Sequence, residues 1–191
     1  EARAADDAIG HAGLDEALFD LAHLGRDAHE HRDLEIVTWV LSGSLHHTDS
    51  EGNDGVVRPG EVQVLSAGSG VTHAEIGGPE GQVRFVQAWL TPEEAGTPPA
   101  YSVDEVDLEP GRLTPVVTVG SSSLAVVRLG AGQSVVLPEA PRLHVFVAAG
   151  ALTRSSLAEP LADGDAFRFT DEPGHAVTAA VPTELMVWSL P

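Results

Sequence analysis

Short segments that resemble β-strands, separated by turns rich in glycine and proline, fill the chain from residue 34 onward. Residues 34–41 (LEIVTWVL) are apolar and β-branched and end at Ser42-Gly43. Residues 44–49 (SLHHTD) alternate in polarity and lead into a turn at residues 50–53 (SEGN). Similar segments recur at a spacing of about ten residues, which is typical of β-sandwiches and barrels. The sequence therefore predicts an all-β protein.

The strand pattern occurs twice along the chain. Residues 91–99 (TPEEAGTPP) are rich in proline and glutamate and mark the start of a linker. In both halves a strand ends in a small residue and glycine, as at Ser42-Gly43 and again at Ala149-Gly150. We predict two β units in tandem, residues 1–100 and residues 101–191. Residues 14–24 (LDEALFDLAHL) fit either a short amphipathic helix or an irregular edge strand.

Two pairs of metal-binding side chains lie within strand-like segments of the first half. His29 and His31 are two residues apart, as are His73 and Glu75. Side chains two residues apart in a strand point to the same face, so each pair directs two such groups into one space. If the two strands face each other, three imidazoles and one carboxylate converge. This pattern predicts a mononuclear metal site.

Composition excludes several classes of function. The net charge is −19, with only ten lysine and arginine residues, which argues against nucleic-acid binding. The chain has no cysteine, so disulfides and thiolate metal ligands are excluded and a structural zinc site is disfavoured. No apolar run approaches the roughly 18 residues of a membrane span. The first residues lack the basic and then apolar pattern of a secretory signal, so we expect a cytoplasmic protein.

Three longer motifs resemble those of the pirin family, especially its bacterial quercetinase-like members. They are HEHRDLEIVTWVLSGSLHHTDSEGN, RPGEVQVLSAGSGVTHAE and FVQAWLTPEEAGTPPAY. The match is dense over residues 29–101, and the second half follows only the general pattern. The resemblance implies a bicupin, with two tandem cupin barrels of the double-stranded β-helix or jelly-roll type. It also implies one metal site, in the first barrel.

The resemblance further implies the ligands and the metal. The family's ligand positions correspond to His29, His31, His73 and Glu75, and the family's metal is usually Fe(II). Nickel, copper, cobalt or manganese occurs in some members. Imidazoles with one carboxylate suit all of these ions and zinc, so the donor types alone do not select the metal.

Several family members oxidise quercetin, so we predict a metal-dependent dioxygenase that acts on quercetin-like flavonols or another enolisable aromatic. In this role Glu75 either stays on the metal or acts as a general base. The alternative is a non-catalytic protein that senses metal or redox state, as the human relative suggests. A third hypothesis is a non-oxygenase reaction in which the metal is a Lewis acid. We expect a monomer with a small aromatic partner.

Other residues are expected near this site. Glu35 is predicted to support the ligands or lie at the core edge, because the resemblance assigns the ligand carboxylate to Glu75. Of the adjacent His46 and His47 only one can face inward, and we predict that His47 lines the pocket. Gln63 is expected to line the cavity or to satisfy buried backbone groups.

Further residues are expected to play structural roles. Gln87 is a second candidate for the cavity wall or for satisfying buried backbone groups. Trp39 and Trp89 are predicted to be core residues. His144 and His175, in the second half, have no neighbouring histidine two residues away.

The start of the chain departs from the family pattern. The first histidine pair begins at residue 29, earlier than is usual in pirins, so one wall of the substrate pocket is expected to be altered. Glu30 replaces the usual proline between the two histidines. Because this position points away from the metal, we expect little effect from it.

Overall fold

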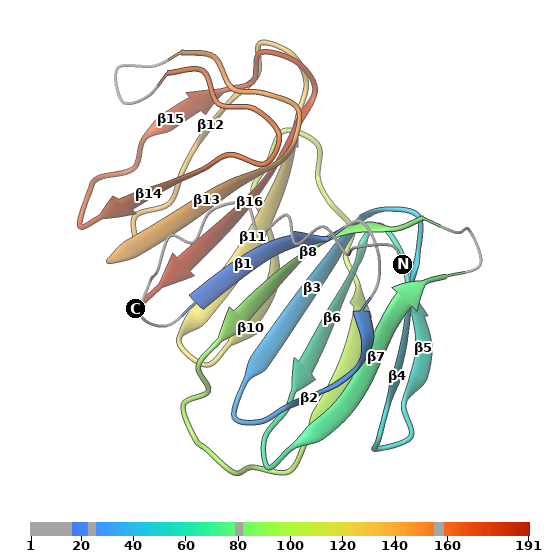
Figure 1. The fold of residues 1–191 in the computed structure, drawn as a ribbon. Coiled ribbons are helices and arrows are strands. Elements are labelled where there is room, and N and C mark those ends of the chain that lie inside the picture. Colours follow the sequence, from blue (N-terminus) through green and yellow to red (C-terminus); the bar gives the residue numbers. More distant parts are fainter. Residues whose placement is uncertain (1–16, 23–25, 79–81, 155–158) are drawn as a thin grey trace. The chain divides into compact units, whose positions relative to one another are not determined.

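The computed structural model of the protein describes residues 17–22, 26–78, 82–154 and 159–191. Within these ranges the regular elements are sixteen β-strands, and no helix there could cross a membrane. The chain divides between Val106 and Asp107 into two units, which are coloured from blue to yellow-green and from yellow to red in Figure 1.

The first unit contains two antiparallel sheets. One has the order β1 (Ala17–Ala22), β8 (Arg84–Leu90), β3 (Glu35–Ser42), β6 (Glu61–Ser66) and β9 (Ala100–Glu105). The other has the order β2 (Arg26–His31), β7 (Val71–Gly77), β4 (Leu45–Asp49) and β5 (Asp54–Val57). Buried apolar side chains from both sheets pack together, for example Val40 and Phe85 of the first sheet with Leu45 and Val57 of the second. The two sheets therefore enclose a common interior.

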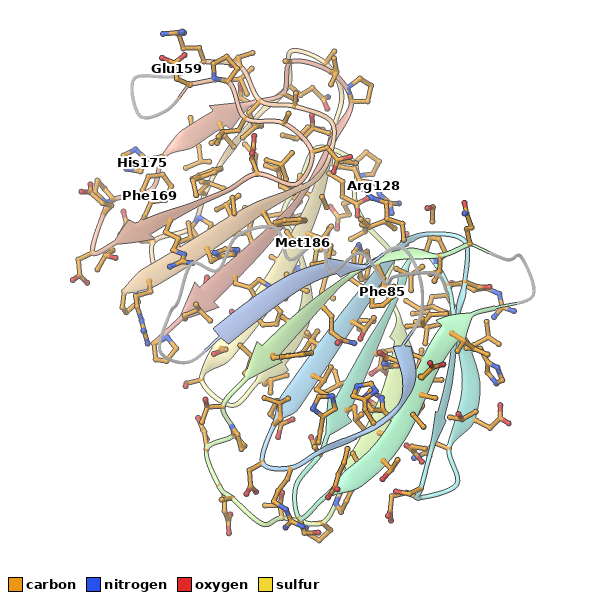
Figure 2. All side chains as sticks on the ribbon, viewed as in Figure 1. Phe85, Arg128, Glu159, Phe169, His175 and Met186 are labelled. Atoms are coloured by element: carbon orange, nitrogen blue, oxygen red, sulfur yellow. The ribbon has the colours of Figure 1, made fainter. Side chains whose placement is uncertain are left out.

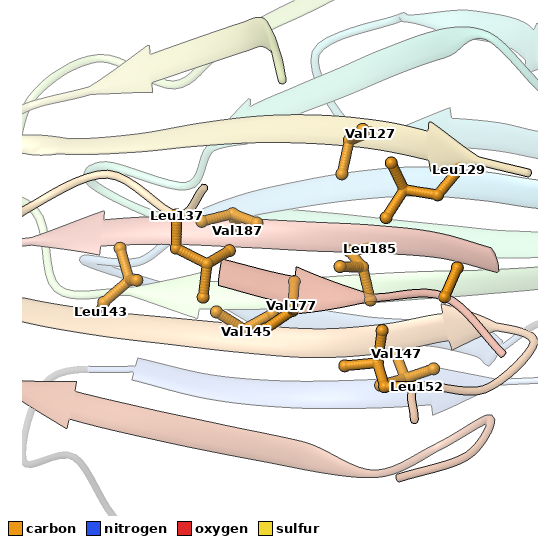
Figure 3. Close-up of a cluster of buried hydrophobic side chains, with 11 residues drawn as sticks. Val127, Leu129, Leu137, Leu143, Val145, Val147, Leu152, Val177, Leu185 and Val187 are labelled. Atoms are coloured by element: carbon orange, nitrogen blue, oxygen red, sulfur yellow. The ribbon is translucent and has the colours of Figure 1, made fainter. Parts of the chain in front are cut away.

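The second unit repeats this plan with a different interior. Its main sheet has the order β10 (Thr114–Val119), β11 (Ser122–Leu129), β16 (Thr183–Leu190), β13 (Arg142–Ala149) and β14 (Ala166–Thr170). A two-stranded sheet joins β12 (Ser134–Val136) to β15 (Ala176–Thr178). Figure 3 shows the buried cluster between these strands, which consists of Val127, Leu129, Leu137, Leu143, Val145, Val147, Leu152, Val177, Ala179, Leu185 and Val187. This cluster contains only aliphatic side chains.

Matching glycines end corresponding strands in the two units. Gly43 follows β3 with φ +73°, and Gly150 follows β13 with φ +86°. In both strands the register shifts by one residue just before the glycine. A Cβ atom would lie 2.1 Å from the carbonyl oxygen of Gln82 at Gly43, and 2.3 Å from that of Pro182 at Gly150. Both the left-handed backbone and the close approach require glycine.

Residues 14–24 were expected to form either a short amphipathic helix or an irregular edge strand, and the structure decides between these for the residues that it describes. Residues 17–22 form the edge strand β1, which pairs with β8 from Ala17 opposite Leu90 to Ala22 opposite Phe85. The helix alternative is therefore wrong for these residues. Residues 14–16, 23 and 24 lie outside the described parts of the chain.

The stretch expected to begin a linker is attached to the first unit. No strand occurs in residues 91–99, but Ser69 N donates to Thr97 O at 2.7 Å and Gly96 N donates to Asp33 Oδ1 at 2.6 Å. The strand β9 follows and pairs with β6, and the first unit continues to Val106.

The glycine turn of the second unit can be tested by substitution. Gly150→Ala is expected to lower the free energy of unfolding by about 2–5 kcal/mol, because left-handed strain and overpacking add. Gly132→Ala is the matched control, since Gly132 has φ +78° but no atom within 4 Å of its would-be Cβ. That variant should lose only about 1–2 kcal/mol. Urea unfolding of both variants measures the difference, and equal losses would contradict the close approach.

Candidate metal centre

Three imidazoles meet where β2 pairs with β7. His29 lies directly opposite His73 in the ladder, after a bulge that separates this pair from Arg26. His31 is two residues further along β2 and so faces the same side. The ring centroids are 4.5 Å apart for His29 and His73, and 5.1 Å apart for His31 and His73. One nitrogen from each of the three lies within 4.8 Å of the others.

His73 is the buried member of this group. Its side chain is 1% exposed, and neither ring nitrogen has a hydrogen-bond partner among the described residues. Burial and the neighbouring imidazoles, opposed by the charge of Glu75, lower the pKa of His73 to about 4. The ring is therefore neutral at neutral pH and has a lone pair available. Leaving two buried ring nitrogens unpaired is costly, and a metal ion would satisfy one of them.

His29 is oriented by a backbone contact. Its Nδ1 donates to the carbonyl oxygen of Asp27 at 2.7 Å, which leaves Nε2 as the atom with a free lone pair. Histidines that bind metals usually donate their other ring N–H to a carbonyl or a carboxylate in this way.

Glu75 is fully buried and held at both oxygens. Gln63 Nε2 donates to Oε1 at 2.6 Å, and Gln87 Nε2 donates to Oε2 at 2.8 Å. The same two amides lie 3.3 Å and 3.1 Å from Thr38 Oγ1. Burial would raise the pKa of Glu75, but the neighbouring histidines and the two amides outweigh it and lower that pKa below its usual range. The carboxylate is therefore charged and fixed in place.

His47 approaches Glu75 from β4. Its side chain is buried, Nε2 donates to Asp49 Oδ2 at 3.1 Å, and Nδ1 lies 3.8 Å from Glu75 Oε1. Burial lowers the pKa of His47, but the carboxylates of Glu75 and Asp49 outweigh it and raise that pKa. One donor atom from each of His47, His73 and Glu75 lies within 4.8 Å of the others. The neighbouring His46 points outward and bonds to Asp54 at 2.7 Å.

The donors suit a first-row divalent metal ion. Neutral imidazoles and a carboxylate are ligands that such ions accept, and the buried imidazole of His73, which has no hydrogen-bond partner among the residues described, fits this use. His29 and His31 are partly exposed whereas His73 is buried, so the outer part of the cluster is nearer to solvent.

Comparison with known proteins identifies the family. The pirin family signature matches residues 4–90. A protein of Mycobacterium bovis, provisionally named a quercetin 2,3-dioxygenase, is 44% identical over 181 residues, which cover 87% of this chain and 74% of that protein. The chain belongs to the pirin family.

Other pirin relatives extend the comparison. The quercetin 2,3-dioxygenase of Escherichia coli K12 is 32% identical over 179 residues, covering 87% of this chain and 77% of that protein. The crystal structure of YhhW from Escherichia coli superposes with a TM-score of 0.79 at 26% identity, covering 92% of this chain and 80% of that one. A YhhW structure in complex with nickel(II) gives a TM-score of 0.75 at 26% identity, covering 92% and 81%. The predicted all-β bicupin is confirmed, and a divalent metal is implied for the family.

The residues predicted from the sequence of this pirin lie in an outer histidine group, in a deeper group around Glu75, and, for Glu35, outside both groups. His29, His31 and His73 form one group, and Glu75 lies deeper, with His47. Gln63 contacts Glu75 directly. In contrast, Glu35 accepts a hydrogen bond from Ser66 Oγ at 2.5 Å and belongs to neither group of potential ligands among the described residues.

Sequence reasoning missed two contributors to the site, Tyr101 and Asp49. Tyr101 stacks on His47 with ring centroids 4.4 Å apart, and its hydroxyl donates to Gln63 Oε1 at 3.2 Å. Burial, followed by the charge of Glu75, raises the pKa of Tyr101 to about 12. Asp49 was read only as a strand end, yet its carboxylate orients His47.

Trp89 was predicted to be a core residue but borders the cluster. Its ring lies edge-on to His31 at 5.5 Å, and its Nε1 donates to Gln87 Oε1 at 2.7 Å. The two-residue spacing between Gln87 and Trp89 was the available signal, because both side chains face one side of β8. Trp39, by contrast, is fully buried as predicted.

The two histidines of the second unit, His144 and His175, have different neighbours. His144 is 3% exposed, and Arg168 Nε donates to its Nδ1 at 3.4 Å. His175 stacks on Phe169 with ring centroids 4.5 Å apart, and Figure 2 shows these two residues side by side. Neither belongs to a group of three potential metal ligands among the described residues.

His144 gives a pH-dependent prediction. Burial and the adjacent Arg168 lower the pKa of His144 from 6.5 to about 4. Below pH 6.5 the unfolded chain binds a proton at this residue that the folded protein rejects until about pH 4. The free energy of unfolding of the unmodified protein should therefore fall between about pH 6.5 and pH 4. In the His144→Gln variant this fall should be smaller by on the order of 3 kcal/mol.

Urea unfolding of the metal-free protein between pH 7 and pH 4 measures this difference. His46→Gln is the control, since His46 lies at the surface of the first unit beside Asp54. Identical pH dependence of the His144→Gln variant and the unmodified protein would contradict the assignment.

Proposed function

We propose that this pirin is a metal-dependent dioxygenase that acts on a small, enolisable aromatic compound of the flavonol type. The observation that carries the proposal is the buried His73, which lies beside two further imidazoles and a fixed carboxylate and whose ring nitrogens have no hydrogen-bond partner in the part of the chain that the structure describes. The names of the relatives support the same reaction class. His29, His31 and His73 would hold the ion together with Glu75, which either stays on the ion or acts as a base, and we propose that the ion is Fe(II).

The metal, the substrate class, the oligomeric state and the location are proposed from the donor chemistry and from the relatives. Nickel, copper, cobalt, manganese and zinc suit the same donors, and nickel(II) occupies one related structure. The absence of basic clusters and the family's small substrates lead us to propose a small aromatic partner. We further propose that the protein acts as a monomer in the cytoplasm.

The side chains around the ion have separate tasks. A bound divalent ion supplies Lewis acidity, which lowers the pKa of a coordinated substrate hydroxyl. Glu75 is charged at neutral pH and accepts the proton from that hydroxyl. Gln63 and Gln87 hold the carboxylate of Glu75 in one orientation while it takes up and releases this proton. Trp89, partly exposed and edge-on to His31, gives the substrate an aromatic neighbour.

Metal content and oxygen uptake test this function. The protein purified without added metal and then loaded anaerobically with Fe(II) should bind about one equivalent and consume O₂ only when quercetin is present. A His29→Ala/His73→Ala variant should lose both the metal and the uptake, because it lacks two of three imidazole ligands. Elemental analysis and an oxygen electrode give the two readouts.

The outcomes separate the competing functions. Metal without quercetin-dependent uptake would contradict the dioxygenase and favour a sensing role. The absence of bound metal after loading would contradict the metal site itself.

The role of Glu75 as base gives a second test. Glu75→Gln keeps the size and the hydrogen-bonding capacity of the side chain but cannot accept a proton. Turnover should fall by a factor of about 10² to 10⁴, while the three histidines still retain the ion. Glu35→Gln is the control, since Glu35 is a carboxylate of the same unit that belongs to neither ligand group. Equal turnover in the two variants would contradict the assignment of Glu75.

A further inference from the structure

Both polar atoms of the Gln63 side chain have partners in the interior of the first unit. Its Nε2 donates to Glu75 Oε1 at 2.6 Å and lies 3.3 Å from Thr38 Oγ1, which uses both N–H bonds. Its Oε1 accepts from the hydroxyl of Tyr101 at 3.2 Å. The side chain is fully buried, so its orientation depends on these protein groups.

The orientation of this amide decides which atom faces Glu75. If the amide of Gln63 were rotated by half a turn, its oxygen would oppose a carboxylate oxygen at a distance of 2.6 Å, and neither atom could donate. A donor at the far end of the amide favours the observed orientation, because it pairs with the amide oxygen there. Tyr101 supplies this donor. Burial raises the pKa of Tyr101 to about 12, so the hydroxyl keeps its proton at neutral pH.

The second glutamine beside Glu75 shows the same arrangement. Gln87 Nε2 donates to Glu75 Oε2 at 2.8 Å, and Gln87 Oε1 accepts from Trp89 Nε1 at 2.7 Å. An indole N–H can only donate, so Gln87 must direct its oxygen to Trp89 and its nitrogen to the carboxylate. Each oxygen of Glu75 is therefore held by an amide whose far end is bonded to an aromatic donor.

Tyr101 is held by both sheets of the first unit. It lies in β9 opposite Leu65 of β6, so Gln63, two residues from Leu65, is its diagonal neighbour on the same face. Its ring stacks on His47 of the other sheet, with centroids 4.4 Å apart and planes inclined by 15°. A Cβ atom on Gly55, which pairs with His47, would lie 3.7 Å from the tyrosine hydroxyl oxygen, so the glycine leaves room for the ring.

We propose that Tyr101 is a positioning residue, whose hydroxyl fixes the amide of Gln63 so that its N–H bonds, and not its oxygen, face Glu75. The effect of Tyr101 on turnover rests on the dioxygenase function proposed above, in which Glu75 acts beside the ion. The hydrogen bond itself requires no metal and can be tested in the metal-free protein. Tyr101 acts through Gln63 and not on the substrate.

The unmodified protein provides a first test. Tyr101 is the only tyrosine of the chain, so isotope-labelled tyrosine reports on this residue alone. In the metal-free protein the hydroxyl proton should exchange slowly enough to be observed by NMR, and it should show a nuclear Overhauser effect to the side chain of Gln63. A proton that exchanges as fast as that of free tyrosine, or that has no contact with Gln63, would overturn the proposal.

Tyr101→Phe provides a second test, because it removes the hydroxyl and keeps the ring on His47. The side-chain N–H protons of Gln63 should exchange more than about 10-fold faster, while those of Gln87 are unchanged. With the metal bound at about one equivalent, kcat should fall about 10- to 100-fold at an unchanged KM. Ser102→Ala is the matched control, since it removes an exposed hydroxyl from the same strand. It should change none of these quantities.

A double-mutant cycle tests whether Tyr101 acts through Gln63. In a Gln63→Leu background, Tyr101→Phe should lower kcat no further, because the amide that the hydroxyl holds is absent. Trp89→Phe, which removes the donor to Gln87, should still lower kcat in that background. Additive losses from Tyr101→Phe and Gln63→Leu would contradict the proposal. Thermal unfolding of each variant checks that it is folded.

The outcomes separate this role from the proposed function. If the unmodified protein shows no quercetin-dependent O₂ uptake, the dioxygenase is wrong, and the NMR measurements on metal-free protein alone decide the role of Tyr101. If uptake occurs but Tyr101→Phe and Ser102→Ala behave alike, the positioning role is wrong and the proposed function stands. Equal acceleration of exchange at Gln63 and Gln87 would show a general loosening of the interior and would also overturn the positioning role.

Discussion

The hydrogen bonds from Gln63 and Gln87 to Glu75 join the two sheets of the first unit around a buried charge. Gln63 lies in β6 and Gln87 in β8 of one sheet, whereas Glu75 lies in β7 of the other. A buried carboxylate is costly unless its oxygens are paired, so the arrangement of the interior depends on these two amides. Their contacts with Thr38 tie the central strand β3 to the same network.

The two units show how one framework serves different purposes. Both end a central strand at a bulge followed by a glycine with positive φ, and both enclose an interior between sheets. The first unit places histidines, glutamines and a glutamate in that interior, while the cluster of the second unit is aliphatic. The fold supplies the enclosure, and the side chains that face inward decide whether chemistry occurs there.

Local patterns made part of this structure predictable. Strand alternation correctly indicated that His29 and His31 share a face, because that rule depends only on backbone geometry. The contribution of Tyr101 depends on which strands become neighbours, and no local pattern encodes this. Asp49, by contrast, lies two residues from His47 on β4, so the same alternation rule could have indicated its contact. The strand β9 (AYSVDE) is mostly exposed and lacks apolar alternation, so its pairing with β6 was not visible in the sequence.

Metal binding and the stability of the interior are physically linked. The network satisfies Glu75 at both oxygens but leaves both nitrogens of His73 without hydrogen-bond partners among the described residues. The folded protein therefore carries an unsatisfied group that a cation would satisfy, whereas the unfolded chain exposes the same imidazole to water. A ligand that binds only the folded state stabilises it in proportion to the logarithm of its concentration. The burial of His73 is thus a cost to the metal-free fold and, at the same time, the source of its affinity for an ion.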